Sequence, residues 1–125
     1  MTINGSVIGD SLRPGAELQP SGWRVTRIWR IDLSAAAGPE QPPVWTAIEF
    51  EADDAQADAL AEVLARSLKR EGGWYADFRV GDDHVVVFAD KVFRYRRGDR
   101  DGRAEAMRYG ESVGVPRINS TGPTE

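Results

Sequence analysis

The stretch that decides the fold runs from residue 73 to residue 97 and reads GWYADFRVGDDHVVVFADKVFRYRR. It holds three runs that are rich in β-branched and aromatic residues: 74–80, 84–89 and 92–97. Short turn sequences separate them, first residues 81–83 and then Asp90 and Lys91. Runs of this length and composition between turn formers are typical of strands joined by hairpins. The sequence therefore predicts an antiparallel meander.

Hairpin turns of defined length assign the side chains of the meander to two faces of the sheet. We expect a two-residue turn at Asp90 and Lys91 and a three-residue loop at residues 81–83. One face then carries most of the rings, and both helices are expected to cover it: Trp74, Ala76, Phe78, Val80, Val86, Phe88, Phe93 and Tyr95. A difference of one residue in the first loop would move the side chains of the first strand to the other face.

Two further strands are expected before the meander. Apolar and polar residues alternate over residues 23–33, although Arg27 falls on the apolar side and Ile28 on the polar side. The alternation over residues 44–51 is regular. Residues 34–43 contain three prolines, which remove backbone donors, so this segment is predicted to be the loop between the two strands.

Two helices are expected, one on each side of the meander. The first is predicted over residues 54–70 because apolar residues recur there at helical spacing: Ala57, Leu60, Ala61, Leu64 and Leu68. Gly72 suits the left-handed position beyond its end. The second is predicted over residues 103–113, with Asp101 as its N-cap.

Together these segments predict an α+β domain over residues 23–118. Its sheet is mainly antiparallel with five strands, its element order is ββαβββα, and both helices pack on one face of the sheet. Residues 1–22 are rich in glycine, serine and proline, and are predicted to be a flexible N-terminal arm with at most a short edge strand. Residues 119–125 are predicted to be a disordered tail.

Composition limits the classes of function that the protein can have. A chain of 125 residues with 41% hydrophobic and 29% charged residues is expected to fold as one domain. The absence of cysteine excludes disulfides, thiolate nucleophiles and cysteine-ligated zinc. A net charge of -4 disfavours non-specific attraction of the whole molecule to nucleic acid or to an anionic membrane. With no signal-peptide pattern and no long apolar run, we expect a soluble cytoplasmic protein with no cofactor and no metal.

The face of the meander that the helices would leave open is the candidate binding surface. It has an apolar centre with a charged rim: Tyr75, Asp77, Arg79, Val85, Val87, Val92, Arg94 and Arg96. Such a surface is expected to be covered by a partner protein, by a second copy of the chain in a homodimer, or by the N-terminal arm. The leading hypothesis is a non-catalytic module that binds a protein or self-associates, as accessory factors and immunity proteins do.

An enzymatic alternative rests on three side chains of the meander. Asp77, Tyr75 and His84 would serve a small cofactor-independent enzyme, of isomerase or cyclase type, with a small-molecule pocket between sheet and helix. His84 is the single histidine, and no second ligand or nucleophile accompanies it at a recognisable spacing. A satisfied structural histidine is the competing interpretation.

A third hypothesis is nucleic-acid binding through the basic and aromatic segment Lys91–Arg103. Arginines there could follow a phosphate backbone while rings stack on bases. On a strand, however, Phe93 and Tyr95 point away from Arg94 and Arg96, because successive side chains alternate between faces. This favours rings in the core and solvated arginines.

Seven segments of the chain share a likeness to known sequences: Gly72–Phe78, Val86–Ala89, Val92–Tyr95, Gly98–Asp99, Gly102–Ala104, Ser11–Gly15 and Trp45–Phe50. Together they resemble a group of small uncharacterised actinobacterial proteins. The resemblance spans most of the chain and implies a bacterial origin. It implies no activity.

Overall fold

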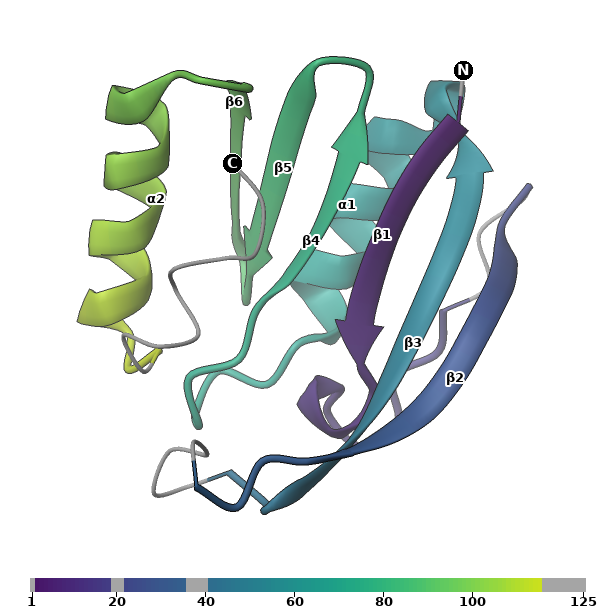
Figure 1. Cartoon of the computed structure of the whole chain (residues 1–125), viewed down its shortest axis with the longest axis vertical. Helices are drawn as coiled ribbons and strands as arrows, with labels where there is room; N and C mark the ends of the chain where they lie inside the picture. The colour runs from purple at the N-terminus through teal and green to yellow at the C-terminus, as the bar shows by residue number, and fades with distance from the viewer. Residues whose placement is uncertain (1, 19–21, 36–40, 116–125) are drawn as a thin grey trace.

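The computed structural model describes residues 2–18, 22–35 and 41–115 (Figure 1). The tail predicted over residues 119–125 lies outside the described residues. The elements follow in chain order: β1 (Thr2–Ile8), η1 (Gly9–Ser11), β2 (Arg24–Asp32), β3 (Val44–Asp53), η2 (Asp54–Gln56), α1 (Ala57–Ser67), β4 (Ala76–Val80), β5 (Asp83–Phe88), β6 (Lys91–Arg96) and α2 (Arg100–Ser112). The protein is therefore an α+β protein, as predicted.

One antiparallel sheet contains the six strands of the described residues, in the order β2-β3-β1-β4-β5-β6. Because β1 is antiparallel to both of its neighbours, β3 and β4 run parallel to each other on either side of it. The chain connects β3 to β4 through α1, which lies behind the sheet in Figure 1. The predicted count of five strands and the predicted ββαβββα order both omit β1.

The prediction that residues 1–22 form an arm is wrong for β1, which is a central strand. Ile3 and Val7 are buried in the main core, while Gly5 pairs with Phe50 on one side and Phe78 on the other. A Cβ on Gly5 would overlap the Cβ of Phe78 and the carbonyl oxygen of Asp77. The glycine that suggested a loop is thus required where three strands approach closely.

The two helices pack on opposite faces of the sheet, not on one face as predicted. On the α1 face, Leu60 and Leu64 are buried in the main core with Val85 and Val87. On the α2 face, a second cluster joins Ala106 to Val86, Phe88 and Tyr95, and the rings of Phe88 and Tyr109 meet at 5.0 Å. Successive residues of β5 therefore point alternately to the two helices.

The predicted register of the meander is wrong at its first turn. Val80 pairs with Asp83, so the turn contains two residues, and Gly81 has a φ of 58° at its first position, the pattern of a type II′ turn. The predicted three-residue loop placed Phe78 on the face of Val86. In the structure, Ala76, Phe78 and Val80 share the α1 face with Val85 and Val87.

The second turn of the meander also differs, but without changing faces. It consists of Ala89 and Asp90, because Phe88 pairs with Lys91. The predicted turn lay one residue later. This displaces each partner by two residues, and an even displacement leaves the side chains on the same face. Phe93 and Tyr95 thus share a face with Val86, as predicted, whereas Arg94 lies on the other.

A β-bulge accounts for the two residues that break the alternation of β2. Val25 pairs with Phe50 and Arg27 with Glu49, so Thr26 is an extra residue without its own partner on β3. The bulge brings Val25 and Ile28 to the α1 face. Arg27 lies on the α2 face with Trp29.

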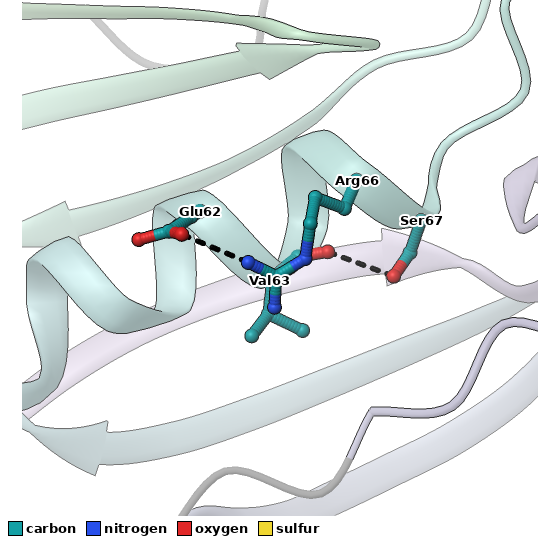
Figure 2. Close-up of polar contacts among 4 residues, drawn as sticks. All are labelled: Glu62, Val63, Arg66 and Ser67. Carbon is teal, nitrogen blue, oxygen red and sulfur yellow. Dashed lines mark hydrogen bonds and ion pairs between the residues drawn. The ribbon is translucent and has the colours of Figure 1, made fainter.

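The helix predicted over residues 54–70 is shorter, with η2 before it and an extended Leu68 after it. On its outer side Arg66 donates to Glu62 at 2.8 Å, one turn away (Figure 2). At its end the Ser67 hydroxyl donates to the Val63 carbonyl at 2.7 Å (Figure 2). The predicted cap of α2 is also displaced, since Asp99 accepts from the Gly102 amide.

Candidate functional site

The predicted binding surface is divided between the two faces of the sheet. Tyr75 packs with the cluster on the α2 face, where Asp77 and Arg79 also project. The remaining residues lie on the α1 face: Val85, Val87, Val92, Arg94 and Arg96. Val85 and Val87 are 2% and 0% exposed in the core with α1. The valine centre of the predicted surface is therefore inside the protein, and no partner can reach it.

The three residues of the enzymatic alternative do come together on the α2 face. Nε2 of His84 lies 2.8 Å from Oδ2 of Asp77, and Nδ1 lies 3.0 Å from the Tyr95 hydroxyl. A carboxylate only accepts hydrogen bonds, so Nε2 donates to Asp77, while the direction of the hydrogen bond between Nδ1 and the Tyr95 hydroxyl follows the protonation state of the imidazole. His84 and Tyr95 are buried. The sequence singled out Asp77 and His84 but not Tyr95, which the pairing of β5 with β6 places beside His84.

Tyr75 stands at the edge of this group. Burial, and next the negative charge of Asp77, raise the pKa of Tyr75 to about 12, whereas Arg103 lowers it. The phenol is thus neutral at physiological pH and is a poor general base. Because both ring nitrogens of His84 are already engaged, the group has the features of a satisfied buried polar network.

Two residues of the basic segment, Arg94 and Tyr95, are engaged in contacts within the protein. Nε of Arg94 donates to Asp83 at 2.8 Å, and its guanidinium lies 3.9 Å from Asp58. The Tyr95 ring is buried against α2, so it cannot stack on a nucleobase. In the part of the chain that the structure describes, no group of three or more histidine or acidic side chains could hold a metal ion.

An apolar groove lies on the α1 face where the sheet extends beyond the helix, between β2 and the segment after η1. Its volume is about 410 Å³, and the residues that line it are all of apolar type: Val7, Leu12, Leu18, Trp23, Val25, Ile28 and Ile48. Val25 is 52% exposed and Ile28 is 63% exposed. We call this feature the β2 groove. It is where the protein exposes its two most accessible large aliphatic side chains among the described residues.

Trp23 forms part of the wall of the β2 groove. Its ring meets Phe50 edge-on with centroids 5.1 Å apart, and it packs against the main core. Its indole nitrogen is buried and has no hydrogen-bond partner among the residues that the structure describes. Trp23 therefore anchors the groove to the core by packing alone.

The strand beside the groove is basic. Arg24 is in contact with Glu51 at 2.5 Å, and the Arg27 guanidinium lies 3.8 Å from the centre of the Trp29 ring. Both of these lie on the α2 face. Arg30 lies on the groove side, because it pairs with Thr46 two positions from Ile28. Among the described residues it has no ion-pair partner.

Sequence reasoning missed the β2 groove, although the sequence held a signal for it. Arg27 and Ile28 are adjacent, and each falls on the wrong side of the alternation. Two successive misfits in a strand indicate an extra residue just before them, which is a bulge. Moving Val25 to the face of Ile28 would have revealed the exposed pair.

The chain matches no protein-family model, no curated protein and no solved structure. The resemblance to uncharacterised actinobacterial proteins stays a prediction. Neither described helix has the length and apolar character needed to cross a bilayer.

Proposed function

We propose that the protein is a non-catalytic module that binds another protein through the β2 groove. The observation that carries the proposal is the exposure of Val25 and Ile28 side by side over an apolar groove that α1 does not cover. A cluster of accessible aliphatic side chains at the rim of a groove is a feature of protein interaction sites. The proposal keeps the function expected from the sequence and moves the surface from the meander to β2.

A non-catalytic role is supported by the chemistry of the other candidate site. His84 holds Asp77 and Tyr95 through its two nitrogens, so a reaction there would have to break a buried hydrogen bond. The Tyr75 phenol, with a pKa of about 12, adds no base. We therefore do not advance an isomerase or cyclase activity.

The β6 edge offers a matched comparison for the β2 groove. Val92 is 40% exposed and borders a second groove, between α1 and β6. That groove is rimmed by charges of both signs: Asp58, Glu62, Arg66, Asp90 and Lys91. Unlike the β2 groove, it has charged residues in its lining, so Val92 is the control position.

The test begins with capture of partners from an extract of the source cells, using the wild-type protein, Ile28→Asp and Val92→Asp as baits. A captured protein is then purified and titrated against all three by calorimetry. We expect Ile28→Asp to weaken binding at least about tenfold, which corresponds to one desolvated aliphatic contact. Val92→Asp should bind as the wild type does.

Two results would contradict the proposal. One is a partner whose affinity is the same for Ile28→Asp and for the wild type. The other is a partner that is lost with Val92→Asp alone. Circular dichroism of both variants must match the wild type, and this is expected because both side chains are partly exposed.

A further inference from the structure

We propose that the partner contributes an extended acidic segment, which pairs with the outer edge of β2 over Ile28–Asp32 and seats an aliphatic side chain beside Ile28. This inference rests on the proposed function and names the chemistry of the partner. It follows from three features of β2: its place in the sheet, its bulge and its charge.

The place of β2 makes it a template for another strand. Among the strands of the described residues it is the last one at one edge of the sheet, at the right in Figure 1, and it pairs there with β3 on its inner side. The outer backbone groups of an edge strand can pair with a strand of another chain, and side chains at alternate positions then give specificity.

The bulge limits where such pairing can occur. Bulges disturb regular pairing and twist an edge, which protects edge strands from indiscriminate contact. Here the irregularity lies between Val25 and Arg27. The stretch Ile28–Asp32 beyond it pairs residue by residue with β3 and is regular. An added strand would therefore pair along these five residues, with Ile28 and the groove at one end.

The charge of β2 selects the partner. The strand holds three arginines and one aspartate, and that aspartate already accepts from the Ser34 amide. Arg30 lies on the groove side without an ion-pair partner among the described residues, and Arg27 is exposed on the other side. An acidic side chain opposite either arginine would form a favourable cross-strand pair.

A second copy of the chain fits this edge poorly. If Ile28–Asp32 pairs with itself about a two-fold axis, Arg30 lies directly opposite Arg30 and Ile28 opposite Asp32. Like charges directly opposite each other are destabilising. The register centred on Trp29 places Ile28 opposite Arg30, and the register centred on Ile31 pairs only residues 30–32, because β2 ends at Asp32. Neither register seats an aliphatic side chain beside Ile28. The observations therefore favour an acidic segment of a different protein.

The test uses a synthetic peptide, acetyl-Thr-Lys-Thr-Glu-Thr-Val-Glu-amide, added to the full-length protein. In the antiparallel register its valine lies opposite Ile28 and its central glutamate opposite Arg30. Its lysine lies opposite Asp32 and its last glutamate opposite Arg27. The control peptide has these charges exchanged: acetyl-Thr-Glu-Thr-Lys-Thr-Val-Lys-amide. Binding is followed by amide chemical shifts in two-dimensional NMR spectra, which detect weak complexes.

We expect the first peptide to shift the amide signals of β2 and of the groove, and to bind about tenfold more tightly than the control, since three cross-strand charge pairs are reversed. The variant Arg30→Glu should reduce or reverse the difference in affinity between the two peptides. The matched variant Arg108→Glu, an exposed arginine on α2, should leave it unchanged.

The inference is overturned if the two peptides bind equally, if the shifts lie away from β2, or if the protein alone self-associates through β2. The last result would identify a second copy as the occupant. These outcomes are separate from the extract experiment. A natural partner that requires Ile28, together with peptides that show no charge preference, would refute the acidic strand and leave the proposed function standing.

Discussion

Val25 and Ile28 lie on the same face of β2, although an odd number of positions separates them and a regular strand would place them on opposite faces. The bulge at Thr26 places both side chains on this face. It creates the exposed aliphatic pair of the β2 groove and at the same time interrupts the edge on which a strand could pair. The exposed aliphatic pair and the interruption of the edge thus arise from one extra residue.

Deletion of Thr26 is predicted to remove the bulge without exchanging the faces of β2. Val25 would stay opposite Phe50 and Arg27 opposite Glu49, in a continuous ladder. A flatter and longer edge should increase self-association, because regular edges pair readily. Sedimentation velocity over a range of concentrations would show this, with Thr26→Ser as the control. A deletion variant that stays as monomeric as the control would show that the bulge does not protect this edge.

Gly5→Ala is predicted to destabilise the fold by about 2–4 kcal/mol, because the added methyl group overlaps Phe78 and the backbone of Asp77 in the centre of the sheet. Gly9→Ala is the matched control, since the nearest atoms to a Cβ there lie 3.6 Å away. It should change stability by less than about 1 kcal/mol. Urea denaturation measures both. Equal stabilities would mean that β1 is not held between β3 and β4.

His84→Ala is predicted to lower the free energy of unfolding by about 1–3 kcal/mol, since it removes a buried partner of both the Tyr95 hydroxyl and the Asp77 carboxylate. Asp82→Ala, an exposed change in the neighbouring turn, should have little effect. Chemical denaturation at neutral pH compares the two. A variant as stable as the wild type would argue that the network is not structural, and would reopen a functional role for His84.

Tyr75 is predicted to make the fold less stable between pH 10 and pH 12. Burial raises its pKa from 10.0 to about 12, so in this window the unfolded chain loses the phenolic proton while the folded protein keeps it. The unfolded state then binds fewer protons, and stability falls as pH rises, by about 2–3 kcal/mol in all.

The variant Tyr75→Phe isolates this contribution. Other groups titrate in the same range in both proteins, so the comparison depends on the difference between their stability curves. The decline between pH 10 and pH 12 should be shallower for Tyr75→Phe. Parallel curves would mean that the phenol ionises alike in the folded and unfolded states.

Local patterns predicted most of the elements and failed at Gly5 and at Gly81. The apolar stripe with Leu60 and Leu64 predicted α1 because helical periodicity needs no long-range information. The prediction missed β1 at Gly5, because composition does not distinguish a glycine required by close packing from a glycine in a loop. The prediction gave the wrong length for the first turn of the meander, because a glycine next to two aspartates, as at Gly81, suits a loop of either two or three residues.

The candidate site was predicted only in part for the same reasons. Asp77 and His84 were named from sequence, but their contact follows from the turn at Gly81, which places both on the α2 face. The β2 groove depends on residues from four segments of the chain, and Leu12, Trp23, Ile28 and Ile48 show no shared pattern in sequence. The resemblance to other proteins and the binding role stay predictions.

The sequence by itself determined which segments after residue 22 are strands and helices and which residues are apolar, because these properties depend on neighbours within a few positions. Only the tertiary structure decided which face each side chain joins, that β1 enters the centre of the sheet, and that the helices cover opposite faces. The physical reason is the two-residue period of a strand. One residue more or less in the turn after Val80 exchanges the faces of the strands that the turn joins, and the extra residue at Thr26 places Val25 and Ile28 on the same face.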